Sequence, residues 1–171
     1  TIVCKSMTKT YSITGWRLGY VIANPEILDR VKKEHDFLTV GAAAPLMEAA
    51  TVGLKFDDKY YDELAAHYAH MKEVFVGGLE KLGLKNTDPQ GAYYVLVDVS
   101  EFGVKDDVKF CEWLAQYVGV AAVPGSSFFR EDVNNLIRFH FAKQDDTLNE
   151  AINRLAGLRK AVAEAGDVEW R

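Results

Sequence analysis

A single apolar stripe in the middle of the chain is the feature that most constrains the fold. Between Asp57 and Gly83, apolar residues recur in steps of three and four, which is the spacing of one face of an α-helix. The stripe consists of Leu64, Tyr68, Met71, Phe75, Leu79 and Leu82. The pattern predicts a long amphipathic helix that ends at Gly83. The elements on its two sides differ, so we expect this helix to connect two parts of the chain.

The residues before this helix follow the pattern of an α/β domain. Residues 2–5 are an apolar run typical of a buried strand, and residues 18–23 indicate a second short strand. Asn24-Pro25 then fits a helix start, with asparagine as the cap and proline in the first turn, and Pro45 fits a second start. We expect residues 1–53 to form the end of a large α/β domain.

The residues after the long helix alternate between strand and helix patterns. Strands are predicted over residues 92–99, 118–123 and 136–142. Helices are predicted over residues 106–117 and 146–165. Together with the connecting helix, this part of the chain, residues 54–171, is expected to form a smaller α+β domain.

Charge and composition favour a small-molecule partner. The chain has 171 residues, of which 49% are hydrophobic and 26% are charged, as in ordinary globular proteins. Its formal net charge is -5, and its basic residues are scattered, so the sequence shows no footprint for nucleic acid. No apolar run is long enough to cross a bilayer, so no membrane partner is expected.

The cysteines and histidines indicate neither a disulfide framework nor a metal site. Cys4 and Cys111 lie far apart in the sequence, which favours reduced thiols and a cytoplasmic location. His67 and His70 share a helix face, but no third ligand accompanies them. We therefore predict no metal ligands.

The segment from Ser6 to Tyr20 has the densest group of chemically useful side chains. It lies between the first two predicted strands, where loops of α/β domains often bind ligands. Lys9 offers a primary amine for an aldehyde, and Arg17 offers a planar fork for a phosphate dianion. A lone lysine or arginine in a loop is usually solvent-exposed without a role, so the spacing of the whole group carries the hypothesis.

This spacing, S-x-[S/T]-K-x-[Y/F]-x-x-x-G-x-R-x-G-[Y/W], is similar to the cofactor-lysine signature of class I and II aminotransferases. The resemblance implies that Lys9 forms a Schiff base with pyridoxal 5'-phosphate. It also implies that Ser6 and Arg17 bind the cofactor phosphate, with Thr8 as a weaker phosphate candidate. Gly19 would let the following strand pass beneath the site. The fold implied is α/β, the C-terminal portion of the fold type I pyridoxal-phosphate-dependent transferase fold.

Arg138 is the second candidate site residue. Strand periodicity places Ile137, Phe139 and Phe141 on one face and Arg138 on the other. An arginine within an apolar strand is costly to bury without an anion, so it pairs with a protein carboxylate or binds a ligand carboxylate. In the family that the sequence resembles, the matching arginine binds the substrate α-carboxylate, which favours the second role.

The resemblance implies a ping-pong aminotransferase that exchanges an amino group between an amino acid and a 2-oxo acid, as a homodimer in the full-length enzyme. It accounts for about the later half of a family member. Relatives supply from their earlier half the aspartate and the aromatic residue that contact the cofactor ring. We therefore expect this polypeptide alone to bind the cofactor weakly and to lack transaminase activity.

Three other interpretations of the sequence are open. Carbon–sulfur lyases and cyclopropane-forming synthases of the same fold keep both the lysine and the arginine. A fragment of a split enzyme, or a cofactor-sensing domain of a regulator, would keep them without catalysing the reaction alone. The motif could also be a coincidence in an unrelated α/β domain.

Overall fold

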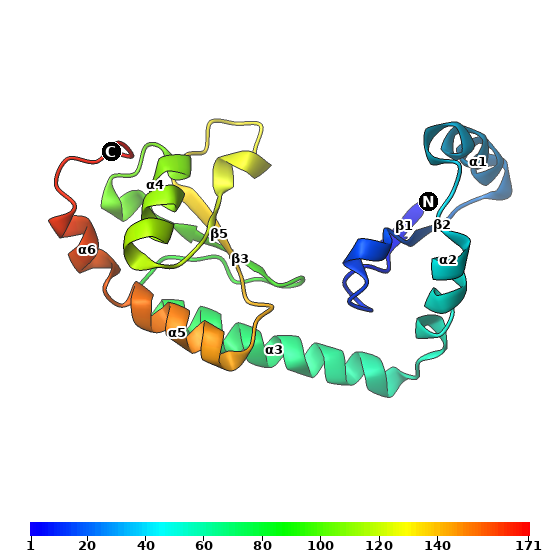
Figure 1. Ribbon diagram of the computed structural model, residues 1–171, viewed down its shortest axis with the longest axis horizontal. Coiled ribbons are helices and arrows are strands. Elements are labelled where there is room, and N and C mark those ends of the chain that lie inside the picture. The colour runs from blue at the N-terminus through cyan, green and yellow to red at the C-terminus, as the bar shows by residue number, and fades with distance from the viewer. The chain divides into compact units, whose positions relative to one another are not determined.

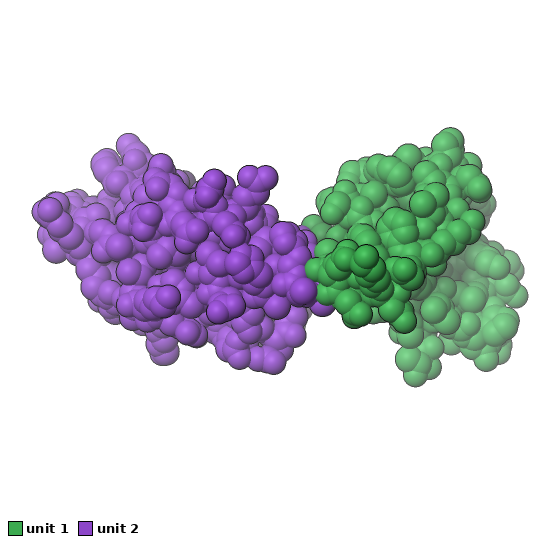
Figure 2. Space-filling view, turned by 90° about the horizontal axis from the view of Figure 1, so that it is seen from below, with its two compact units in different colours: residues 1–64 green, residues 65–171 purple.

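The computed structural model describes residues 1–171 and divides into two compact units (Figure 2), residues 1–64 and residues 65–171. The division falls within helix α3, Asp58–Lys81, whereas the sequence predicts a domain boundary between residues 53 and 54, which stays a prediction. No helix combines the length and the apolar character needed to span a lipid bilayer.

Unit 1 begins with a two-stranded antiparallel sheet (Figure 1). Strand β1, Val3–Ser6, pairs with β2, Gly19–Ile22, in a register that runs from Val3 opposite Ile22 to Ser6 opposite Gly19. Both predicted strands are therefore confirmed. The expectation that the first strand is buried is wrong: all its residues are exposed, because β1 has a single strand partner and its faces stay accessible in unit 1.

The helices of unit 1 begin where the sequence predicts. Helix α1 spans Pro25–Thr39, and the side chain of Asn24 accepts a hydrogen bond of 2.9 Å from the backbone N–H of Glu26, which caps it. Helix α2 spans Ala44–Ala50. Short 3-10 helices lie at Thr14–Trp16 and Gly53–Lys55. The small core of the unit is built from Met7, Leu18 and Ala50.

Helix α3 confirms the predicted long helix and contributes to both units. Residues 58–64 belong to unit 1, and the rest of the helix belongs to unit 2. The apolar stripe is buried at Met71, Phe75 and Leu79, and the neighbouring Val76 is buried as well. Gly83 follows the helix with a φ of 68°, a left-handed conformation that glycine adopts readily. The stripe therefore packs into the core of unit 2.

Unit 2 contains a three-stranded antiparallel sheet in the order β3-β5-β4. The strands are β3, Tyr94–Asp98, β4, Val123–Pro124, and β5, Leu136–His140. The buried residues of the sheet alternate along β3 and β5 and join the helices in one core; they are Val95, Val97, Ile137 and Phe139. The expected inward face of the last strand is thus confirmed, and Arg138 lies on the other face.

The strand predicted over residues 118–123 is wrong for most of its length. Residues Leu114–Val118 form a π-helix that continues α4, and Gly119 ends it with a φ of 75°. Only Val123–Pro124 pairs with β5. The β-branched residues of this segment fit a strand pattern, but Val118 still belongs to the preceding helix, and residues 119–122 form neither helix nor strand.

The helices of unit 2 are α4, Asp107–Trp113, α5, Asp145–Leu155, and α6, Leu158–Glu164, with 3-10 helices at Ser100–Phe102 and Gly125–Phe128. The single helix predicted over residues 146–165 is wrong, because the chain breaks at Gly157. Leu155 and Leu158 flank the break, and both are buried in the core. The apolar periodicity continues across the break, so the pattern did not reveal it.

Two adjacent glycines of α3 provide a test of its packing. A Cβ added at Gly78 would lie 2.7 Å from two carbon atoms of Ile152 in α5, whereas a Cβ at Gly77 meets nothing within 4 Å. We expect Gly78→Ala to destabilise the chain by about 1–3 kcal/mol through overpacking. Gly77→Ala should instead stabilise it by about 0.5–1 kcal/mol, since alanine is the better helix former.

Urea unfolding of the two variants measures this difference. Equal effects of both substitutions would contradict the contact between α3 and α5.

Candidate functional site

Pairing of β1 with β2 closes a loop, residues 7–18, that carries the predicted cofactor lysine; we call it the lysine loop. Its ends are joined by a backbone hydrogen bond of 3.1 Å from Met7 N–H to the Leu18 carbonyl. Next to it, a Cβ on Gly19 would lie 2.7 Å from the carbonyl oxygen of Lys5. Only glycine allows this close approach of the two strands, in line with the role expected for Gly19.

Two hydroxyl groups meet at the start of the lysine loop. Ser6 Oγ lies 2.7 Å from Thr8 Oγ1, and the Thr8 backbone N–H donates to Ser6 Oγ at 3.3 Å. Thr8 is buried, with 8% of its surface exposed. The structure thus brings two of the predicted phosphate ligands together, directly after the carboxyl end of a strand.

Arg17 lies at the other end of the lysine loop in an uncommon backbone conformation. Its φ is 57°, and that of Ser12 is 56°, values that cost energy in residues with a side chain. Loop hydrogen bonds hold this shape, among them Ile13 N–H to the Thr8 carbonyl at 3.0 Å. The Arg17 guanidinium donates to the Thr14 carbonyl at 3.2 Å and is exposed. Its further N–H groups suit an anion.

Lys9 stands between the buried Thr8 and a pair of residues anchored by α3. The Tyr60 hydroxyl donates to the Thr10 carbonyl at 2.6 Å, and the Tyr11 and Tyr61 hydroxyls lie 2.8 Å apart. The hydrogen bond with Tyr61 raises the pKa of Tyr11 to about 12. The backbone on both sides of the lysine is therefore fixed. The two α3 tyrosines could not be predicted from the sequence, because they are remote from the motif.

Arg138 lies in unit 2, stacked on aromatic rings. Its guanidinium carbon is 4.2 Å from the centre of the Tyr94 ring and 3.7 Å from that of Phe128. No carboxylate forms an ion pair with it. Its Nε is buried and has no hydrogen-bond partner. A buried donor that lacks a partner within the chain is costly, so Arg138 is a candidate for binding an external anion.

The guanidinium opens on a pocket of about 330 Å³. Its lining comprises Thr87, Pro89, Gly91, Tyr94, Leu96, Phe128, Phe129 and Arg138. These residues come from β3, β5 and the segments around them. Of these residues, the sequence predicts only Arg138 as a site residue, because aromatic residues such as Tyr94 and Phe128 fit core positions equally well.

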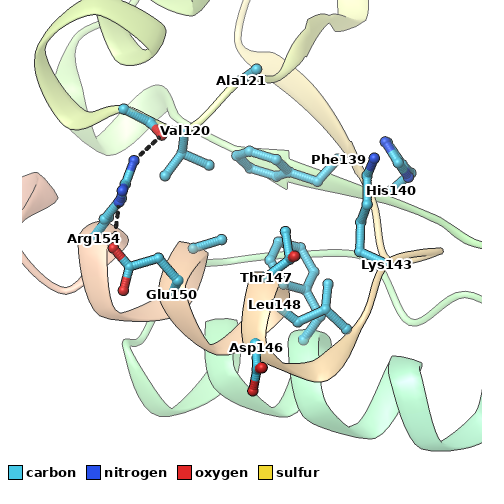
Figure 3. Close-up of a pocket in the computed structure, with 13 residues that line it drawn as sticks. Val120, Ala121, Phe139, His140, Lys143, Asp146, Thr147, Leu148, Glu150 and Arg154 are labelled. Carbon is cyan, nitrogen blue, oxygen red and sulfur yellow. Dashed lines mark hydrogen bonds and ion pairs between the residues drawn. The ribbon is translucent and has the colours of Figure 1, made fainter.

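A second cavity, of about 610 Å³, lies between α5, β5 and residues 119–121 (Figure 3). Its floor includes Phe75 and Phe139, and Arg154 borders it, bonded to Glu150 at 2.7 Å and to the Gly119 carbonyl at 2.9 Å. This cavity contains none of the predicted catalytic, cofactor or substrate residues.

Comparison with known proteins connects these features to a family. The pattern of the family described as aminotransferase class I and II matches residues 1–155. The chain belongs to this family. The resemblance seen in the lysine motif is therefore confirmed.

The curated relatives are longer than this chain. It is 36% identical over 158 residues to methionine aminotransferase of Escherichia coli, covering 92% of this chain and 41% of the relative. It is 32% identical over 173 residues to a probable N-succinyldiaminopimelate aminotransferase of Mycobacterium tuberculosis, covering 95% and 44%. The chain thus spans about two fifths of these relatives. Their names do not favour the lyase or regulator interpretations.

Solved structures of family members share the fold. The crystal structure of YbdL from Escherichia coli, identified with a methionine aminotransferase function, matches with a TM-score of 0.83 at 36% identity, over 91% of this chain and 41% of that one. The N-succinyldiaminopimelate aminotransferase structure from Mycobacterium tuberculosis matches with a TM-score of 0.84 at 33% identity, over 92% and 42%. The predicted fold class, a C-terminal portion of the fold type I fold, is confirmed.

Substitution of Gly19 tests whether the close strand approach shapes the lysine loop. We expect Gly19→Ala to separate β2 from β1 at a cost of about 1–3 kcal/mol, as for other overpacked sites. Hydrogen–deuterium exchange of peptides covering residues 1–23 should then become faster. Gly15→Ala is the matched control in the same loop, since a Cβ there meets nothing within 4 Å. Equal exchange in both variants would show that the contact at Gly19 does not hold the loop.

Proposed function

We propose that this chain carries the cofactor lysine and the substrate arginine of a pyridoxal-phosphate-dependent aminotransferase, which transfers an amino group between an amino acid and a 2-oxo acid by a ping-pong mechanism. The observation that carries the proposal is the lysine loop. Within it, Lys9 directly follows in sequence the paired hydroxyls of Ser6 and Thr8, and Arg17, whose φ is positive, lies near the other end of the loop.

The residues of the lysine loop fit the phosphate group of the cofactor. A phosphate dianion needs hydrogen-bond donors and positive charge, and it binds arginine through two parallel N–H bonds. Ser6 and Thr8 supply hydroxyl donors that already lie together. Arg17 supplies the charge and further donors. In this assignment Ser6, Thr8, Lys9 and Arg17 are the cofactor-binding residues.

Lys9 has two tasks in the proposed mechanism. When bound, pyridoxal phosphate supplies an aldehyde that reacts with amines and a ring that accepts electrons from the substrate α-carbon. Lys9 Nζ is the primary amine that holds the aldehyde carbon between turnovers. As a free amine, Lys9 Nζ would act as the base that takes a proton from the substrate α-carbon.

Arg138 binds the substrate carboxylate in this proposal. The aromatic rings of Tyr94 and Phe128 cover its guanidinium, so the N–H groups at its edge are the ones suited to a ligand. The unpartnered Nε, together with a terminal N–H group, matches a carboxylate in bidentate geometry. This contact would fix the orientation of the substrate α-carbon, which lowers the entropic part of the barrier.

The remaining features of the whole enzyme extend this proposal. We infer a homodimeric, cytoplasmic enzyme whose small-molecule partners are an amino acid and a 2-oxo acid, with residues 1–53 and 54–171 contributing to its large and small domains. Both cysteines are free thiols, which supports a reducing compartment. The names of the relatives cover methionine, aspartate and kynurenine, so the proposal extends to amino acids as a class.

Reductive trapping tests the role of Lys9. The chain is incubated with excess pyridoxal phosphate, reduced with borohydride and mapped by peptide mass spectrometry. We expect the label on the Lys9 peptide in preference to the other lysines, and its loss in Lys9→Arg. Arg17→Ala should lower labelling of Lys9 by about tenfold, as loss of a charged hydrogen bond predicts.

Pyridoxal without the phosphate is the matched control. Its labelling of Lys9 should be weak and insensitive to Arg17→Ala, because it lacks the group that Arg17 binds. Labelling spread over the lysines of the chain, with no preference for Lys9, would contradict the proposal.

A further inference from the structure

Asp107 is a nearly completely buried carboxylate that the proposed mechanism does not use. It lies in the first turn of α4 with 1% of its surface exposed. The helix is capped by its neighbour Asp106, which accepts from Lys109 N–H at 3.0 Å. Asp107 therefore has no part in the cap, and its burial needs another reason, since a buried charge must be hydrogen-bonded.

Both carboxylate oxygens of Asp107 bind one residue. Oδ2 accepts from the Ser126 backbone N–H at 2.8 Å, and Oδ1 accepts from the Ser126 hydroxyl at 2.8 Å. Ser126 belongs to the short helix Gly125–Phe128, and a Cβ on Gly125 would lie 2.5 Å from the Leu136 carbonyl oxygen. This short helix thus packs closely against β5 at Gly125 and is bound by Asp107 at Ser126.

The short helix carries the ring that stacks on Arg138. Phe128 is two residues beyond Ser126, and its ring lies 3.7 Å from the Arg138 guanidinium carbon. Nearly half of the Phe128 surface, 49%, is exposed, so burial alone holds it weakly. The position of the ring depends on the backbone that carries it, and Asp107 fixes that backbone.

We propose that Asp107 is a positioning residue: through Ser126 it holds Phe128 over Arg138 and so fixes the plane in which the guanidinium receives a carboxylate. A guanidinium binds a carboxylate bidentately only when the two groups are nearly coplanar. Stacking on the ring restricts rotation of the guanidinium out of that plane. The inference rests on the carboxylate role proposed for Arg138, and it assigns Asp107 no contact with the substrate.

Nuclear magnetic resonance of the Arg138 side chain tests this role in the 171-residue chain. The Nε–Hε signal is assigned by its loss in Arg138→Lys, and Phe128→Leu gives its frequency without the ring. In Asp107→Asn we expect the signal to move towards the Phe128→Leu frequency. Titration with pyruvate, a simple 2-oxo acid, should show affinity weakened by about threefold, the size of one exposed cation–π contact.

Asp98→Asn is the matched control, because Asp98 also binds both the backbone N–H and the hydroxyl of one serine, although through a single oxygen. Its Oδ1 accepts from the Ser100 N–H at 3.0 Å and from the Ser100 hydroxyl at 2.6 Å, and these bonds lower the pKa of Asp98 well below the ordinary value. Ser100 is not part of the Arg138 pocket. We expect Asp98→Asn to leave both the signal and the pyruvate affinity at wild-type values.

Ser126→Ala is a milder second variant, since it removes one of the two bonds and keeps the carboxylate. This variant should move the Arg138 Nε–Hε signal part of the way towards the Phe128→Leu frequency. An unmoved signal in both Asp107→Asn and Ser126→Ala overturns the inference, and so does an equal movement in Asp98→Asn. A wild-type signal that does not respond to pyruvate would instead contradict the carboxylate role of Arg138, while the signal positions without ligand still report on Asp107.

Discussion

The close pairing of β1 with β2 is the constraint on which the proposed cofactor site depends. The strands meet at Gly19, where the Lys5 carbonyl leaves no room for a side chain. This contact joins the two ends of the lysine loop, so Ser6 lies opposite Gly19 although the two residues are far apart in sequence. The loop can then hold two non-glycine residues in left-handed conformations, because its hydrogen bonds offset their strain.

Helix α3 links this loop to the rest of the chain through packing at both of its ends. In unit 1, Tyr60 and Tyr61 of its first turn bond to the residues next to Lys9. In unit 2, Phe75 and Leu79 of its later turns lie in the core that supports β5. One continuous helix therefore supports the backbone of the lysine loop and the strand that carries Arg138.

The parts of the fold that depend on local patterns could be predicted from the sequence. The α3 stripe, the Asn24 cap and the inward face of β5 each follow from spacing alone. The break at Gly157 could not be predicted, because apolar periodicity continues through it.

In the candidate site, too, residues with a local spacing could be predicted and residues brought in by tertiary contacts could not. The lysine motif revealed its own members because their spacing is local. Tyr60 and Asp107 could not be predicted as site residues, because a tyrosine in a helix and an aspartate beside a helix cap are common in sequences. Only the fold shows that they bind Thr10 and Ser126. Arg138 could be placed on a strand face, but its unpartnered Nε is visible only in three dimensions.

A crystal structure of the chain grown with pyridoxal phosphate tests the central claim most directly. We expect density joining Lys9 Nζ to the cofactor, with the phosphate within hydrogen-bond distance of the Ser6 and Thr8 hydroxyls and of the Arg17 guanidinium. A cofactor bound at another lysine, or a phosphate that contacts neither hydroxyl nor Arg17, would contradict it.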